Sequence, residues 1–418
     1  MFGITRPRIR AWLKSLAMAA LAVLIEMVKP ILLVLLRLRR RQPARSLWTG
    51  TPIINMAVCA RAERTLGIQA DSLVFYTYFI SSEFTYDMSG WARGPAIWRE
   101  VLLPFFVLCW ACLRYQRFHF FCDRGLLPGS RFLCNEHELK LLRFLGKKIY
   151  LYAYGADVRT RKETEALGTF NCCTECPNPG NACVCDDAKG AAHQTLLTKY
   201  ADAVFSMGDM IHYTPGSCND LYYWPIDLEK DQGQRYAPSY PDPESTRPIR
   251  IVHAPNHRGF KGTHFLIEAV ESLRNEGHAL ELVLVERVPN DQALEIYRTA
   301  DIIFDQCLIG FHGYFALEAM AMGKPVMVFI RHPQEYLIAA HECPLVNTPA
   351  DRVVDVLRSL LHDRQRLHAL GTKGRQYIAQ HHTLAAFARR LAQKYQDFEA
   401  PVGTCSKSRT AISSSIAA

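Results

Sequence analysis

Three consecutive segments in the second half of the chain, ALELVLVER (279–287), DQALEIYRTA (291–300) and DIIFDQC (301–307), read as a strand, a helix and a strand. IRIVHAP (249–255) and KPVMVFI (324–330) extend the series on either side as further apolar runs of strand length. Apolar strands that alternate with amphipathic helices indicate an α/β domain with a parallel sheet. Because ligands of such sheets bind at the carboxyl ends of the strands, a site is expected in the loops that follow them.

The first half of the chain shows the same alternation less regularly, with strand-like DSLVFYTYF (71–79), KKIYLYAYGADVR (147–159) and ADAVFS (201–206). A stretch rich in proline and polar residues, 230–248, separates the halves and reads as a linker. A chain of 418 residues is long enough for two complete cores. We therefore expect an α/β protein with two Rossmann-like domains, 46–235 and 249–385, then the end of a C-terminal helix, 386–403, and a disordered tail, 404–418.

The net positive charge of the chain is concentrated at its N-terminus. Residues 1–45 contain ten Lys or Arg and a single acid, Glu26, whereas the other 373 residues carry 39 basic and 39 acidic side chains. Nucleic-acid-binding domains carry a basic stripe on the folded body, and the body of this chain is neutral. No nucleic-acid partner is expected.

An apolar segment, LAMAALAVLIEMVKPILLVLL (16–36), lies inside this basic head and predicts an apolar helix with basic flanks. Glu26, Lys29 and Pro30 interrupt it, and a charge near the centre of a bilayer is costly, which disfavours a membrane span. We expect residues 1–45 to lie along an anionic membrane surface. A span, a signal peptide and a helix packed within the protein remain alternatives, and a second apolar run, 101–113, is expected to be a buried helix.

The fourteen cysteines are dispersed except in one place, NCCTECPNPGNACVCDD (171–187). Cys173, Cys176, Cys183 and Cys185 offer four thiolates on one short loop, a set that suits a structural tetrahedral zinc. Reduced thiols without a ligand, disulfides and an iron–sulfur cluster are the alternatives.

The loop and helix GFHGYFALEAMAMGKPV (310–326) follow a predicted strand, where a ligand would bind. Gly313 would let the backbone approach an anion, and the amides of His312, Gly313 and Tyr314 are expected to be free at the helix start, where the helix dipole favours a phosphate. Glu318, about one turn further, could accept hydrogen bonds from the vicinal hydroxyls of a sugar. An ordinary helix with a glycine cap and a surface glutamate explains the same spacing.

Together these segments resemble the retaining glycosyltransferases of the GT-B fold, specifically the large family four. LEAMAMGKPV (317–326), HRGFKGTHFLIEAV (257–270), IYRTADIIF (296–304) and YGADVR (154–159) are similar to motifs of that family in order and spacing. The resemblance implies two Rossmann-like domains that face a central cleft, and a nucleotide diphosphate sugar as the donor. It assigns Arg258 and Lys261 to the diphosphate, Gly313 and Tyr314 to phosphate through their amides, Glu318 to the ribose, and Asp157 and Arg159 to the cleft.

The chain departs from the family pattern at two positions. The family's first glutamate falls on Gly310, so the carboxylate that usually faces the transferred sugar is absent, and His312 is expected to replace it as a polar contact. The histidine of the first-domain loop falls on Tyr154, which does not ionise easily near neutral pH. Asp157, Arg159 and His312 are the candidate catalytic residues.

These features predict a retaining glycosyltransferase that is cytoplasmic and attached peripherally to the inner face of the cell membrane. Its acceptor is expected to be a lipid-linked or surface-polysaccharide glycan, and no metal is expected in the chemistry. A catalytically inactive relative that acts as a scaffold and a GT-B sugar-nucleotide epimerase are the alternatives.

Overall fold

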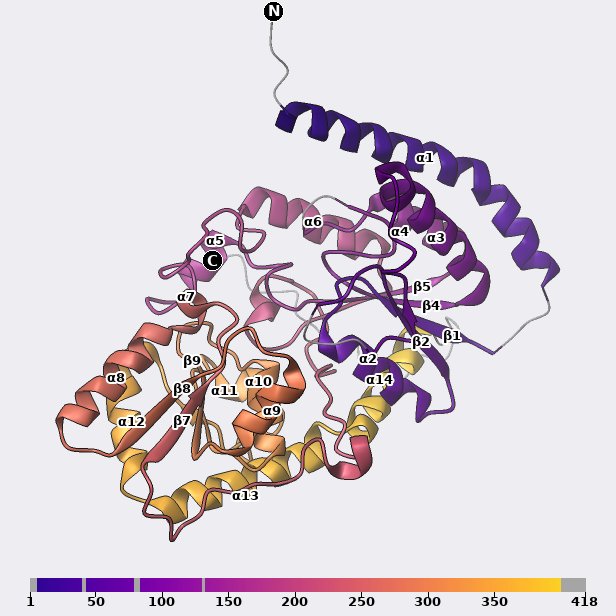
Figure 1. Cartoon of the computed structure of the whole chain (residues 1–418). Coiled ribbons are helices and arrows are strands. Elements are labelled where there is room, and N and C mark those ends of the chain that lie inside the picture. Colours follow the sequence, from indigo (N-terminus) through magenta and orange to yellow (C-terminus); the bar gives the residue numbers. More distant parts are fainter. Residues whose placement is uncertain (1–5, 40–42, 79–82, 130–131, 400–418) are drawn as a thin grey trace, which may run out of the picture.

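The computed structural model describes residues 6–39, 43–78, 83–129 and 132–399 (Figure 1). The predicted tail, 404–418, lies outside the described residues. The first domain contains a parallel six-stranded sheet with the order β3-β2-β1-β4-β5-β6. Its strands are β1 (Arg45–Thr49), β2 (Gln69–Val74), β3 (Tyr86–Asp87), β4 (Arg117–Phe121), β5 (Lys148–Tyr152) and β6 (Ala203–Phe205).

Helices flank this sheet and connect its parallel strands. The predicted helix at 101–113 is present as the end of η1 and most of α3, but it is only partly buried: one side packs into the first core, while Phe106 and Trp110 are exposed. The helical elements of this half are α1 (Arg6–Leu38), α2 (Ile54–Arg64), η1 (Trp98–Leu102), α3 (Leu103–Arg114), α4 (Glu136–Phe144), α5 (Arg161–Ala166), α6 (Asp187–Tyr200), η2 (Gly208–His212) and η3 (Lys230–Gly233).

The second domain contains a parallel five-stranded sheet with the order β11-β10-β9-β7-β8. Its strands are β7 (Ile249–His253), β8 (Leu280–Leu284), β9 (Ile302–Gln306), β10 (Val326–Val328) and β11 (Val346–Asn347). Its helices are α7 (Arg258–Lys261), α8 (Thr263–Asn275), α9 (Asn290–Arg298), α10 (Tyr314–Ala321), α11 (Pro333–Tyr336), η4 (Ala350–Arg352), α12 (Val353–Leu361) and α13 (Arg364–His381). Two parallel α/β domains confirm the fold class that the sequence predicts.

The last helix, α14 (Leu384–Glu399), leaves the second domain and packs beside α2 of the first (Figure 1). The hydroxyl of Tyr395 donates to Oε1 of the buried Glu63 at 2.7 Å, and Arg117 Nε donates to Oε1 of Glu399 at 2.7 Å. Burial raises the pKa of Glu63. The chain passes from the first domain to the second at the linker and returns to the first before α14. Two covalent connections therefore join the domains that form the cleft.

The N-terminal helix α1 lies across α3 and α4 at the edge of the first domain (Figure 1). Leu21, Ile25 and Leu32 are buried against the domain. The opposite side of the helix is also apolar and faces outward. Its exposed members are Leu16, Val23, Met27, Ile31, Val34, Leu35 and Leu38.

Residues 15–38 are long and apolar enough to cross a membrane, by length and composition only. However, Glu26 is 62% exposed and pairs with Lys29 at 3.2 Å near the middle of the segment. Nζ of Lys29 also lies 4.5 Å from the ring centroid of Phe144 on the first domain. The helix therefore has one apolar side on the protein and a second apolar side that no described residue covers.

Candidate functional site

The site is built around the start of α10, where β9 ends and the chain turns into the helix. The amide of Gly313 donates to Oδ2 of Asp305 at 2.5 Å. The prediction that this amide is free is therefore wrong, because a carboxylate from the end of β9 already binds it. A Cβ at Gly313 would lie 3.2 Å from both Oδ1 of Asp305 and Nζ of Lys261, so the close packing of these groups needs a glycine here.

Lys261 belongs to the same cluster. Its Nζ lies 2.5 Å from Oδ1 of Asp305, which is completely buried, while the lysine side chain is 12% exposed. An ammonium group has three donors, and this contact uses one of them. Asp305 therefore fixes the ammonium at the helix start and leaves donors for a second anion.

A cavity of about 290 Å³ opens in front of this cluster, with walls from both domains. The second domain supplies Lys261, His312 and Gly313, and the first supplies Tyr154 and Arg159. We call it the lysine cavity. The structure thus brings together four of the predicted site residues, Arg159, Lys261, His312 and Gly313, although the first and last of them lie 154 positions apart in the chain.

Arg159 is held in one position by a buried ion pair. Its Nε and Nη2 donate to the two carboxylate oxygens of Asp209 at 2.8 to 3.0 Å. Asp209 is 1% exposed, and the contact to it raises the pKa of the arginine against the effect of burial. Nη1 makes none of these bonds, so the guanidinium can still present a donor to the cavity.

Asp157 lies behind the wall of the lysine cavity. Its Oδ1 accepts from the amides of Tyr154 and Gly155 at 2.9 and 2.8 Å, and the residue is completely buried. Burial, with a smaller effect of Asp123, raises the pKa of Asp157 to about 8. It shapes the turn after β5 and is separate from the side chains that line the cavity.

His312 lies in the wall of the lysine cavity as a neutral imidazole. Burial lowers its pKa to about 4, and its ring centroid lies 4.1 Å from that of Phe311. Nδ1 is 3.3 Å from the carbonyl oxygen of Gly313. If Nδ1 donates there, Nε2 is left as a hydrogen-bond acceptor for a ligand hydroxyl.

Arg258 lies outside this group. Its Nε and Nη2 donate to the carboxylate of Glu286 at 2.8 and 2.6 Å, and its side chain is 54% exposed. The structure therefore keeps Lys261 at the cavity and places Arg258, three residues earlier on α7, on the surface.

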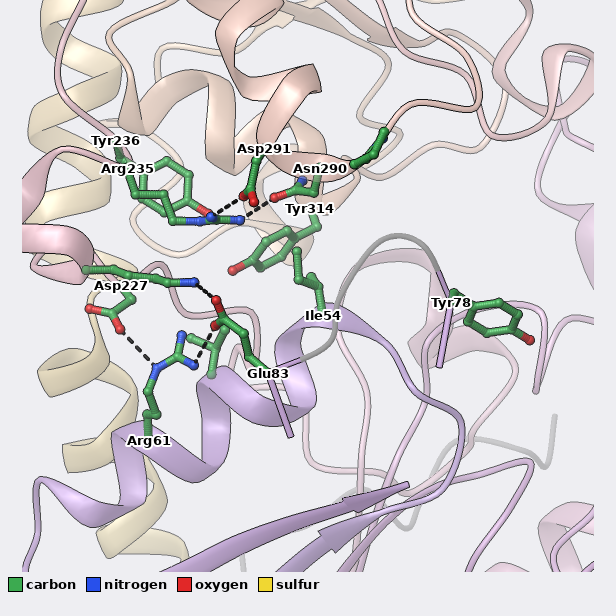
Figure 2. A pocket seen from close by; sticks show the side chains of 13 residues that line it. Ile54, Arg61, Tyr78, Glu83, Asp227, Arg235, Tyr236, Asn290, Asp291 and Tyr314 are labelled. Atoms are coloured by element: carbon green, nitrogen blue, oxygen red, sulfur yellow. Dashed lines mark hydrogen bonds and ion pairs between the residues drawn. The ribbon is translucent and has the colours of Figure 1, made fainter. Parts of the chain in front are cut away.

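Glu318 lies beside a second interdomain cavity, whose lining residues Tyr236 and Asn290 are drawn in Figure 2. It is 4% exposed, and its Oε1 accepts from Tyr236 at 3.1 Å and from Asn290 at 3.3 Å. Both partners line a cavity of about 280 Å³, which we call the Arg61 cavity. Tyr314 lines it too, with its hydroxyl bound to the carbonyl of Pro225 at 2.9 Å.

Ion pairs surround the Arg61 cavity and join parts of the chain that are distant in sequence (Figure 2). Arg61 on α2 binds Asp227 at 3.1 Å and Glu83 at 3.3 Å. Arg235 binds Asp291 at 2.6 Å at the start of α9. The start of α10 therefore separates two cavities, one with Lys261 and one with the partners of Glu318.

Burial raises the pKa of Glu318 to about 7 from its ordinary value of 4.5. The folded protein therefore holds a proton that the unfolded chain releases between about pH 4.5 and 7, and the wild type loses stability as the pH rises through this window. Relative to Glu318→Gln, we expect the wild type to lose about 3 kcal/mol of unfolding free energy between pH 4 and pH 8. Urea unfolding of both proteins at the two pH values measures this, and equal differences would contradict it.

The cysteine loop does not form the predicted zinc site. Within the described part of the chain, no three His, Cys, Asp or Glu side chains are arranged to hold a metal ion. The loop instead packs across the cleft: a Cβ at Gly259 on α7 would lie 2.2 Å from the carbonyl oxygen of Glu175. Cys172 and Cys183 line the lysine cavity.

Gly310, where the resemblance implies a glutamate, has a structural explanation. Its φ is +92°, and a Cβ there would lie 3.0 to 3.3 Å from atoms of Arg331. Arg331 crosses to the first domain, where its Nη1 and Nη2 donate to the carbonyls of Leu167 at 2.6 Å and Phe170 at 3.1 Å. Gly310, where the family has a glutamate, therefore leaves space for the side chain of Arg331, which binds the backbone just before the cysteine loop.

Three carboxylates of the site escaped the sequence analysis. Asp305 and Asp209 hold Lys261 and Arg159, and Oδ2 of Asp123 accepts from the hydroxyl of Tyr154 at 3.0 Å. Asp305 lies near the end of the parallel strand β9, and Asp123 follows the parallel strand β4. Carboxylates at the ends of such strands could have been predicted as site residues from the sequence. Asp209 follows no such rule, because it reaches Arg159 through η2.

The second domain is similar in sequence to known proteins. Residues 261–393 match the model of a family described as glycosyl transferase-like. This match covers 133 of the 418 residues, from Lys261 into α14. No curated protein is similar enough in sequence to match the chain.

Solved structures share the fold of most of the chain. Sucrose-phosphate synthase from Thermosynechococcus elongatus is 15% identical, with a TM-score of 0.51 over 86% of this chain and 100% of that one. A glycosyltransferase from Rickettsia africae ESF-5 is 12% identical, with a TM-score of 0.50 over 86% and 100%. WaaG, a glycosyltransferase involved in lipopolysaccharide biosynthesis, is 13% identical, with a TM-score of 0.50 over 84% and 99%. At these identities the likeness shows the fold, which is the GT-B arrangement that the sequence predicts.

Proposed function

We propose that the protein is a retaining glycosyltransferase that moves a sugar from a nucleotide diphosphate sugar to an acceptor hydroxyl. The observation that carries this proposal is the cluster of Lys261, Asp305 and Gly313 at the start of α10, in front of a cavity with walls from both domains. Its support is the match of residues 261–393 to a glycosyl transferase-like family and the fold shared with glycosyltransferases.

The diphosphate of the donor would bind at Lys261. The ammonium keeps two donors after its contact with Asp305, and the positive end of the α10 dipole adds to its attraction for an anion. Glu318, one turn further along α10, would accept hydrogen bonds from the ribose, and the base would enter the Arg61 cavity beside Asn290. The lysine cavity would thus bind the sugar and the phosphates of the donor, and the Arg61 cavity would bind its nucleoside.

The chemistry needs few groups from the protein. The bond between the anomeric carbon and the leaving phosphate oxygen breaks, the acceptor oxygen bonds to that carbon from the same side, and its proton passes to the leaving phosphate. Lys261 stabilises the negative charge that develops on the phosphate. Arg159 and the neutral His312 would orient the sugar from opposite walls of the lysine cavity, so that no protein base is required.

The acceptor is proposed to be lipid-linked and to reach the enzyme at the cytosolic face of a membrane. The support is the outer side of α1, whose apolar side chains are exposed while its inner side is buried on the first domain. Arg37 and Arg39 at the end of the helix would meet anionic lipid head groups. Glu26, which is exposed in the middle of the segment, favours a helix that lies in the interface over one that spans it.

A panel of nucleotide diphosphate sugars tests the proposal. A donor at 100 times its Kd stabilises the native protein by about 2.7 kcal/mol, and we expect one donor class to raise Tm accordingly in the wild type but not in Glu318→Ala. With membrane lipid extract added, the same donor should release nucleotide and label a lipid. Stabilisation without release would support a scaffold, and interconversion of the free donor without an acceptor would support an epimerase. Either result would overturn the proposal.

A further inference from the structure

The first domain carries an apolar groove that the proposed chemistry does not use. Its volume is about 420 Å³, and nine nonpolar side chains line it, from β2, from β3 and the residues after it, and from η1 and α3. Trp91, Trp98 and Trp110 are among them, together with Phe106 and Tyr86. We call it the tryptophan groove.

The groove is exposed and has little to offer a polar ligand. Trp91 is 66% exposed, Phe106 55% and Trp110 37%, which is unusual for large aromatic side chains so close together. The indole N–H of Trp98 is already bound to the carbonyl of Trp91 at 2.8 Å. The ring of Tyr86 packs edge-on against Trp110, with centroids 5.4 Å apart. A ligand that gains affinity here must do so by burying hydrocarbon.

The position of the groove connects the membrane-facing helix with the cleft. On one side, η1 and α3, which form one wall of the groove, also pack against α1. On the other side, the connection between β2 and β3 starts and ends at groove residues Leu73 and Tyr86, and it carries Tyr78 and Glu83 to the Arg61 cavity. The groove therefore shares its helical wall with the contact surface of α1, and strands β2 and β3, which also line it, are followed and preceded by residues of the Arg61 cavity.

The size of the groove favours a small ligand over a protein. Its volume falls in the range of about 300 to 1,000 Å³ that small-molecule pockets occupy. A stable contact with a second copy of the chain would need about 800 Å² of surface from each partner, most of which would come from outside the groove.

We propose that the tryptophan groove binds the hydrocarbon chain of the lipid-linked acceptor and so holds its head group at the interdomain cleft. This inference rests on the proposed function, because it names the part of the acceptor that the enzyme recognises. It gives a role to the exposed aromatic side chains on the first domain that the proposed chemistry does not use. The chain end would lie toward the membrane and the reacting hydroxyl toward the cleft.

Quenching of tryptophan fluorescence by a brominated alkyl maltoside, used below its micellar concentration, tests the groove directly. Three of the six tryptophans line the groove, and bromine quenches only fluorophores that it contacts. We expect saturable quenching in the full-length wild type. Phe106→Asp keeps every tryptophan and should weaken binding about tenfold, since it places a charge among the apolar walls. Phe144→Asp, at an aromatic residue of similar exposure outside the groove, is the matched control and should bind as the wild type does.

The outcomes separate the groove from the donor site. Absent quenching, or equal quenching in Phe106→Asp and the wild type, overturns the groove even if nucleotide sugars stabilise the protein. Saturable quenching without stabilisation of the protein by any donor would support the groove as a hydrocarbon-binding site and would refute the proposed function. A dimer in the wild type that Phe106→Asp converts to a monomer would show that a second copy occupies the groove, and would also overturn the proposal. If Phe106→Asp fails to fold by circular dichroism, Trp91→Ser, at the most exposed wall position, replaces it.

Discussion

Lys261→Met is expected to destabilise the protein by about 3 to 5 kcal/mol, because it leaves the completely buried carboxylate of Asp305 without its cation. The amide of Gly313 would remain as a partner of that carboxylate, and one neutral donor does not replace an ammonium at 2.5 Å. Urea unfolding measures the loss. Lys140→Met breaks an exposed pair with Glu136 at 3.1 Å and serves as the matched control, with an expected loss below about 0.5 kcal/mol.

A double variant separates the fold from the function of this lysine. Lys261→Met combined with Asp305→Asn removes both charges, so most of the lost stability should return. If Lys261 binds the diphosphate, the stable double variant still fails to respond to the donor that stabilises the wild type. Full donor affinity in that protein would contradict the proposed role of Lys261, and a small loss in the single variant would contradict the buried pair.

Asp209→Ala is expected to produce the second large effect. It leaves the guanidinium of Arg159, whose side chain is only 15% exposed, without its counter-charge, and removal of one partner of a buried pair costs about 3 to 5 kcal/mol. Because Arg159 lines the lysine cavity, the freed side chain should also turn, and transfer activity should fall more than donor binding. Urea unfolding and the two assays of the donor panel measure these effects.

An exposed pair of the same type provides the comparison. Arg161 and Glu165, one turn apart on α5 at 3.0 Å, are both more than half exposed, so Glu165→Ala should change the unfolding free energy by less than about 0.5 kcal/mol. Equal losses for Asp209→Ala and Glu165→Ala would show that the ion pair of Arg159 contributes no more than a surface contact. Unchanged activity in Asp209→Ala would remove Arg159 from the proposed mechanism.

The sequence predicted the elements whose periodicity is strong and local. The second sheet and α10 follow directly from alternating apolar runs, and α3 follows from the length of the run at 101–113. Four short strands were missed, and two of them, β3 and β11, have only two residues each. β1, RSLWT, begins at Arg45, which the charge analysis had assigned to the basic head, and β4, RFHFF, is too short and too aromatic to stand out as alternating.

The sequence predicted residues of the site where a single local motif contains both the backbone and the side-chain groups involved. Gly313 and Glu318 lie on one loop and helix, and the resemblance to the family assigned both of them to the donor. The amide of Gly313 was expected to be free, and it binds Asp305, because a carboxylate eight residues earlier folds back from the end of β9. The predicted zinc has no support in the structure, since no three His, Cys, Asp or Glu side chains of the described residues are arranged to hold a metal ion.

By itself the sequence determined two parallel α/β domains and a basic apolar head, because each of these depends on local composition and periodicity. Only the tertiary structure decided that Arg159 and Lys261 face one cavity, that Arg258 does not, that α14 returns to the first domain and that an apolar groove adjoins α1. These relations depend on which buried charges find partners and which apolar faces are covered across the fold. These contacts form between residues that are far apart in the sequence, and no local sequence pattern predicts them.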